Sequence, residues 1–146
     1  MIQKTLENTE RAPQRLSWKA IGIIGVHAFV GWMLCTASMA ISMATTTVEN
    51  ALIIHAIGAP IFYTIISLIY FNRFNYTSPL RTAVIFVAFV ILMDFFVVSL
   101  MVLGSFDMFF SLLGTWIPFT LIFASTYLTG VYTLKNKKDK NVRSAI

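Results

Sequence analysis

The chain has 146 residues, of which 58% are hydrophobic and only 12% are charged, with a formal net charge of +5. A soluble domain is about 45–50% apolar and about 25% charged, and so much apolar surface does not fit into one core of this size. The composition therefore argues against an ordinary soluble domain and favours a protein of the lipid bilayer. No nucleic-acid partner is expected, because the positive charges stand at the ends of apolar runs instead of covering one basic face.

Four apolar runs follow one another, and each exceeds the approximately 20 residues with which an α-helix crosses a ~30 Å hydrocarbon core. Backbone polar groups in lipid must be satisfied within the segment, so helices are the expected state of all four runs. The connections between them are short, which predicts an all-α membrane protein whose helices form an up-down antiparallel bundle. The four predicted transmembrane helices are Ala20–Ser42, Ala51–Phe71, Arg81–Leu103 and Met108–Leu134, within a transmembrane domain of residues 20–134.

The first run has a second interpretation as a cleaved signal peptide. A basic segment precedes it, and Ser38-Met39-Ala40 resembles a cleavage site. The run is, however, about 23 residues long, which is more than the 7–15 residues of a signal-peptide core. We therefore expect it to remain in the membrane as a helix.

The placement of charge predicts the orientation of the bundle. The connections 43–50 and 104–107 contain no Lys or Arg. The positive-inside bias therefore places both termini in the cytoplasm and the protein in the cell membrane, with residues 1–19 as an N-terminal segment and residues 135–146 as a basic tail. This tail either contacts anionic lipid headgroups or serves only to fix the topology. The cations that lie on this one side are Lys4, Arg11, Arg15, Lys19, Arg73, Arg81, Lys135, Lys137, Lys138, Lys140 and Arg143.

No motif of a soluble enzyme is present in the sequence. There is no phosphate-binding glycine loop, no metal-ligand spacing and no nucleophile elbow, and Cys35 is the only cysteine. We therefore expect no enzymatic activity, no cofactor and no bound metal. Ionisable groups in transmembrane helices are costly and usually face the bundle interior or a cavity, which makes His27, His55 and Asp94 the first candidates for a functional site.

Depth in the membrane separates the two histidines. Counted from the inner helix ends at ~1.5 Å per residue, His27 lies about 10 Å deep, whereas Asp94 and His55 lie about 20 Å and 24 Å deep. The two histidines therefore cannot both ligate one haem iron within the chain. Asp94 and His55 are expected to face one another as a proton or cation site, at a level where Pro60 and Pro118 each free a backbone carbonyl. The alternative is that Asp94 is a buried hydrogen-bonded acid that only fixes the register of the helices.

Small polar residues form a stripe along the last helix. The helical period places Thr115, Ser125, Thr126 and Thr129 within roughly a third of its circumference, and it places Ser38 on the face of the first helix that carries His27. Such residues are candidates for the lining of a polar pathway. The simpler interpretation is that small polar side chains allow close packing between helices.

The sequence His55-Ala56-Ile57-Gly58-Ala59-Pro60, together with Gly114-Thr115-Trp116-Ile117-Pro118 and the lone Asp94, resembles a set of uncharacterised small four-helix bacterial membrane proteins. The resemblance covers most of residues 20–132 and implies a fold but no activity. Small multidrug transporters differ, because they carry a mid-membrane Glu on their first helix. Vitamin K epoxide reductase-like proteins differ in having paired cysteines.

Two functions from different classes remain open at this point. The first is a proton- or cation-linked transport component that acts as a homo-oligomer, because four helices barely enclose a pathway. The second is a structural or accessory subunit of a larger membrane complex, with no chemistry of its own.

Overall fold

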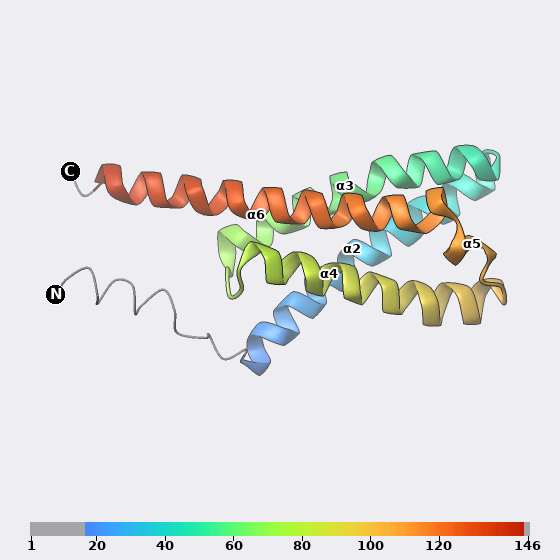
Figure 1. Cartoon of the computed structure of the whole chain (residues 1–146), viewed down its shortest axis with the longest axis horizontal. Coiled ribbons are helices and arrows are strands. Elements are labelled where there is room, and N and C mark those ends of the chain that lie inside the picture. The colour runs from blue at the N-terminus through green and yellow to red at the C-terminus, as the bar shows by residue number, and fades with distance from the viewer. Residues whose placement is uncertain (1–16, 145–146) are drawn as a thin grey trace.

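The computed structural model describes residues 17–144, except for the side chains of Val102, Leu103 and Met108. Over this range the chain is helical and contains no strand (Figure 1). Four of its helical segments are long and apolar enough to cross a membrane, namely Trp18–Thr45, Val48–Arg73, Pro79–Met101 and Leu112–Ser144. The prediction of an all-α chain with four helices of transmembrane length is confirmed. Residues 1–16 of the expected N-terminal segment and the last two residues of the tail lie outside the described range.

The first two helices, α2 (Trp18–Thr45) and α3 (Val48–Arg73), are joined by only two residues, Thr46 and Thr47. The sequence predicted a connection over residues 43–50. Threonine hydroxyls explain the difference: Thr46 Oγ1 donates to the carbonyl of Ser42 at 2.9 Å at the end of α2, and Thr47 Oγ1 accepts the Asn50 N–H at 3.4 Å at the start of α3. Side chains thus satisfy backbone groups that helix ends leave open.

The third helix, α4 (Pro79–Met93), begins with a strong start signal. Ser78 is its N-cap, and Pro79 occupies the first helical turn, where a missing N–H costs nothing. Buried hydroxyls hold the preceding turn in place, because Thr77 shares hydrogen bonds with Tyr70 at 2.9 Å and with Thr82 at 2.7 Å. The end of α3 and the start of α4 are therefore fixed to one another.

At Asp94 the third span changes from an α-helix to a π-helix, η1 (Asp94–Leu103). The fourth span is also interrupted: α5 (Asp107–Phe110) is followed by the extended residue Ser111, then by the π-helical η2 (Leu112–Trp116) and by α6 (Ile117–Ser144). The sequence predicted one continuous helix over residues 108–134. Ser111 ends the first piece, since its Oγ caps the N–H of Gly114 at 3.1 Å and starts a new helix.

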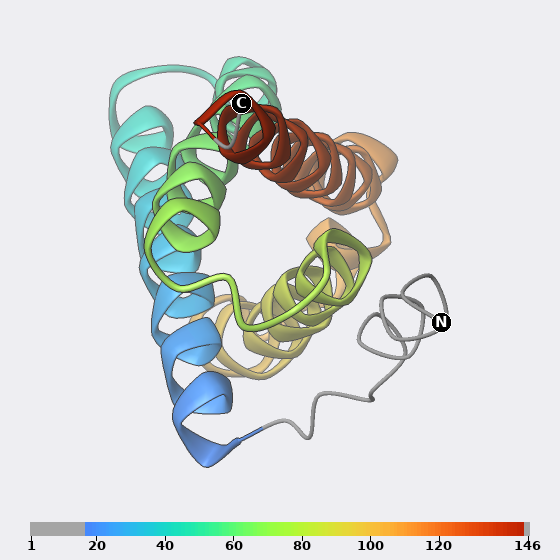
Figure 2. The same ribbon diagram turned by 90° about the vertical axis from the view of Figure 1, so that its left-hand side faces the viewer.

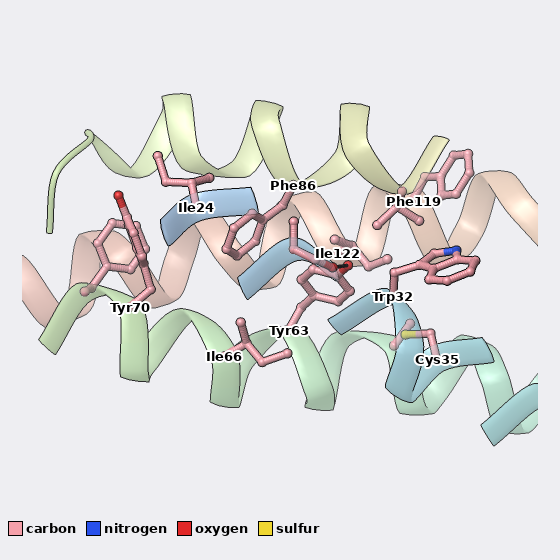
Figure 3. Close-up of a cluster of buried hydrophobic side chains, with 13 residues drawn as sticks. Ile24, Trp32, Cys35, Tyr63, Ile66, Tyr70, Phe86, Phe119 and Ile122 are labelled. Atoms are coloured by element: carbon pink, nitrogen blue, oxygen red, sulfur yellow. Dashed lines mark hydrogen bonds between the residues drawn. The ribbon is translucent and has the colours of Figure 1, made fainter. Parts of the chain in front are cut away.

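The end-on view shows α2, α3, α4 and α6 arranged around a common interior (Figure 2). Buried aromatic and aliphatic side chains fill this interior, as the close-up shows (Figure 3). Tyr63 is fully buried, packs edge-on against Phe86 at 5.6 Å and donates a hydrogen bond to the Ala28 carbonyl at 3.1 Å. Gly31 makes room for this ring, because a Cβ at that position would lie 2.6 Å from Tyr63 Cζ. The core is therefore closely fitted at this point.

The last helix, α6, packs against both α3 and α4. Gly130 permits the close approach: a Cβ there would lie 2.7 Å from the Phe71 ring and 2.7 Å from Pro79 Cβ. Further along, Lys137 Nζ donates to the carbonyls of Phe71 at 2.7 Å and Asn72 at 3.0 Å, at the end of α3. The basic segment that begins at residue 135 continues this helix as far as Ser144, since no Gly or Pro interrupts it.

Candidate functional site

A cavity of about 160 Å³ is lined by residues of α2, α3, α5 and the two π-helical segments. Among the described residues that line it, Asp94 is the only acid and none is Lys or Arg. Most of the others are aliphatic or aromatic, with a few hydroxyl groups and one imidazole between them. The lining residues are Trp32, Thr36, Met39, Ala40, Met43, His55, Asp94, Val97, Val98, Ser99, Phe109, Gly114 and Thr115.

Asp94 stands at the point where α4 becomes η1. Its Oδ1 accepts a hydrogen bond of 2.8 Å from the indole N–H of Trp32 on α2. Within residues 17–144, no second hydrogen bond and no ion pair to this carboxyl group is found. A charged Asp at the bilayer centre costs ~2.5–3.5 kcal/mol on insertion scales. One neutral donor offsets only part of that cost, since such a bond contributes about 1.5–3 kcal/mol when its acceptor is charged.

Trp32 reaches Asp94 from the buried face of α2. Trp32 is only 5% exposed and lies at one end of the core cluster (Figure 3). Ala28, Cys35 and Met39 occupy the same face of the helix at intervals of three or four residues. The aromatic core therefore holds the indole in place, and the indole holds one oxygen of the acid.

His55 lines the same cavity from α3. Its Nδ1 is buried and has no hydrogen-bond partner among the described residues, although the ring interacts with the backbone carbonyl of Cys35. No hydrogen bond or ion pair in the described part of the chain joins His55 to Asp94. The two residues share a cavity, while the donor at Asp94 is Trp32; their direct pairing stays a prediction.

Hydroxyl groups complete the polar part of the wall. Ser99 on η1 and Thr115 on η2 are buried, and Thr36 on α2 is half-buried. The proline at position 118 explains why η2 bulges here: Pro118 has no N–H for the Gly114 carbonyl, and the N–H of Ile117 bonds to Leu112, five residues back. Gly114, whose carbonyl lacks a helical donor because of Pro118, thus forms part of the cavity wall.

The other polar candidates do not line this cavity. His27 lies among aromatic rings: its Nδ1 bonds to the Ile23 carbonyl of its own helix at 2.7 Å, and its ring contacts Tyr70 and Phe74 edge-on. Ser38 faces α3, where its Oγ lies 3.8 Å from the place of a Cβ on Gly58. Both residues thus lie at contacts with other parts of the chain and outside the lining of this cavity.

The polar stripe on the last helix is buried or half-buried in the bundle, and most of it lies outside the cavity. Thr126 is fully buried with no hydrogen-bond partner for its Oγ1 within the described range, and Thr129 is half-buried. Ser125 donates to the Ile122 carbonyl of its own helix at 3.1 Å. Of the four stripe candidates, only Thr115 lines the cavity.

The prediction of site residues missed most of the cavity wall, and above all Trp32. One signal was available: a tryptophan on the buried face of a helix needs an acceptor for its N–H, and Asp94 is the only acid inside the apolar runs. Met39, Met43 and Phe109 gave no signal, because apolar residues are ordinary throughout these segments.

No family model, no curated protein and no solved structure matches the chain. Within the described residues, no group of three or more His, Cys, Asp or Glu side chains is placed to hold a metal ion. The most distinctive chemical feature of the described residues is one carboxyl group in a mostly apolar cavity.

Proposed function

We propose that the chain is a multi-pass protein of the cell membrane that binds a proton or a cation at Asp94 as a component of transport. The observation that carries this proposal is the cavity itself, in which one carboxyl group has one neutral hydrogen-bond donor and no positively charged neighbour in the wall. Acids in transmembrane segments are costly to keep, and they commonly mark ion and proton pathways. The π-helical backbone on both sides of the cavity supports a functional role, since π-helical turns are frequent at functional sites.

The proposal includes an up-down antiparallel bundle with both termini in the cytoplasm. Short links between successive spans support this arrangement. Charge supports the orientation, because the links at 46–47 and 104–106 carry no Lys or Arg, whereas Lys19, Arg73 and Arg81 flank the opposite helix ends. Large aliphatic side chains cover the outside of the helices, as expected of surfaces that face lipid.

The transporting unit is proposed to be a homo-oligomer, because a bundle of four helices encloses only a narrow pathway. The exposed end of α6 carries Lys138, Lys140 and Arg143, which we assign to contacts with anionic lipid headgroups. No catalysed reaction and no cofactor is part of this proposal.

A second candidate is a structural or accessory subunit, and one observation favours it. The hydrogen bond between Trp32 and Asp94 ties α2 to η1 across 62 positions of the sequence. Such a bond fixes how two helices pack, without any need for the acid to exchange a proton or hold a ligand. The two candidates differ in what happens when the acid is replaced by its amide.

Flux measurements separate the candidates. The full-length chain is reconstituted into vesicles that contain a proton-, Na⁺- or K⁺-sensitive dye, and a gradient of the matching ion is imposed in separate experiments. We expect the wild type to dissipate at least one gradient and Asp94→Asn to behave like protein-free vesicles. The control is Glu49→Gln, which changes an exposed carboxyl group in the first turn of α3 and should leave the flux unchanged. Equal flux in the wild type and a folded Asp94→Asn would favour the structural role.

A further inference from the structure

We infer that the cavity around Asp94 binds a small organic cation, an alkyl- or arylammonium ion of about the size of benzylamine, and that Asp94 pairs with its ammonium group. This inference rests on the proposed role of Asp94 as a cation site and adds the chemical class of the cation. Its grounds are the size of the cavity, the chemistry of its wall and the position of its exposed edge.

Size limits the ligand to a small molecule. An engineered cavity of about 150 Å³ lined by apolar side chains binds benzene, and the cavity at Asp94 has about 160 Å³. A ring with one short substituent therefore fills the space. A single proton or a bare metal ion leaves most of it empty or occupied by water.

The wall favours an organic body over a hydrated metal ion. Met39, Met43, Val97, Val98 and Phe109 supply a large apolar share of the lining. A divalent cation such as Ca²⁺ or Mg²⁺ requires about six or more oxygen ligands, and a wall of this kind replaces few of its waters. A hydrocarbon group, by contrast, gains free energy from every methylene group that it removes from water.

The polar groups match an ammonium head. An ammonium ion presents hydrogen-bond donors only, and the wall offers it the carboxylate of Asp94 and the hydroxyl of Ser99 as acceptors. The rings of Trp32 and Phe109 add aromatic faces and edges, and aromatic faces attract cations. An anionic ligand has no partner, since none of the lining residues is Lys or Arg.

The exposed edge of the cavity lies on the last turns of α2. Ala40 and Met43 are the lining residues that are exposed, whereas Met39 behind them is buried. Methionine side chains are flexible and polarisable, so they adapt to ligands of different shape. A small amine thus has a route to Asp94 past Met43 that does not cross the aromatic core.

The test uses benzylamine as the probe and benzyl alcohol as its uncharged analogue. Binding to the full-length chain in lipid nanodiscs is measured by calorimetry. We expect benzylamine to bind about tenfold or more tightly than benzyl alcohol, since a charge pair in a low-dielectric site contributes that much. Asp94→Asn should remove this preference, and Glu49→Gln should keep it. Equal binding of the two probes to the wild type would overturn the inference.

A second variant distinguishes loss of the cavity from loss of the folded structure. Val98→Phe fills the cavity and leaves Asp94 and Trp32 in place, and its melting temperature shows whether it folds. We expect a folded Val98→Phe to lose binding of both probes, and unchanged binding would overturn the inference. If benzylamine fails to bind while Asp94→Asn still abolishes ion flux, the proposed function stands without this ligand class. If benzylamine binds through Asp94 but no gradient is dissipated, the ligand class stands and transport does not.

Discussion

At the scale of single residues, Trp32 supplies a hydrogen-bond donor to Asp94, and Asp94 supplies an acceptor to Trp32. A buried indole N–H requires an acceptor, and an acid in the membrane requires a donor or a proton. The two side chains meet at 2.8 Å although they are 62 positions apart in the sequence. Their bond is therefore a tertiary contact that joins the aromatic core to the cavity.

Replacing the indole tests this bond. Trp32→Phe keeps an aromatic ring in the core but removes the N–H, which leaves the acid without its donor. We expect the free energy of unfolding to fall by about 1–3 kcal/mol, measured by denaturant titration in detergent micelles. The matched control is Trp116→Phe, since Trp116 is 50% exposed. Equal losses for the two variants would show that the hydrogen bond does not contribute.

Two replacements of Asp94 separate the loss of charge from the loss of the acceptor. Asp94→Asn retains a carbonyl oxygen for the Trp32 N–H, whereas Asp94→Leu leaves that donor unsatisfied. We expect Asp94→Leu to unfold at a lower temperature than Asp94→Asn, with a difference of about 1–3 kcal/mol in stability. The same thermal scan in micelles measures both. A Leu variant as stable as the Asn variant would mean that water replaces the lost acceptor.

The sequence identified residues of the candidate site only where an ionisable residue interrupts an apolar run. Asp94 and His55 stand out because ionisable residues are rare in apolar runs, and both line the cavity. Met39, Val97 and Phe109 line it as well, but every helix of this chain is rich in such residues. Polarity can be detected against an apolar sequence, whereas the apolar part of a binding site cannot.

At the scale of elements, length and hydropathy predicted the four spans because the bilayer demands about 20 apolar residues for each. The changes of helix type were not predicted. Pro118 hinted at the irregular turn before it, but the segment Asp94–Leu103 contains neither Gly nor Pro. Its residues therefore gave no local signal for a π-helical backbone.

Helix packing can be tested at two glycines of the same helix. Gly31→Ala would bring a Cβ to 2.6 Å from Tyr63 Cζ, so the ring must move away from Phe86 and Ala28. We expect a loss of about 1–3 kcal/mol in unfolding free energy, typical of overpacking. Gly25→Ala is the control, since a Cβ there meets nothing within 4 Å. A neutral Gly31→Ala would show that α2 and α3 adjust freely.

At the scale of the whole molecule, the charges predict which side of the membrane each end occupies. A reporter attached after Ile146 should be cytoplasmic, and one inserted between Thr46 and Thr47 should be external, because the cations flank only one set of helix ends. Fusions that report both sides in intact cells measure this directly. A reversed pattern would contradict the orientation while leaving the four helices in place.

The close approach at Gly130 has a consequence for the order in which the protein is made. Gly130 brings α6 against Phe71 at the end of α3 and against Pro79 at the start of α4. Because α6 leaves the ribosome after α3 and α4, it joins two helices that precede it in the chain. Until residues 117–144 have been translated, α3 and α4 share α2 as a common neighbour but lack their contacts with α6. A nascent chain that ends before α6 therefore holds α2, α3 and α4 in contact through α2, and translation of α6 adds the remaining contacts of the bundle.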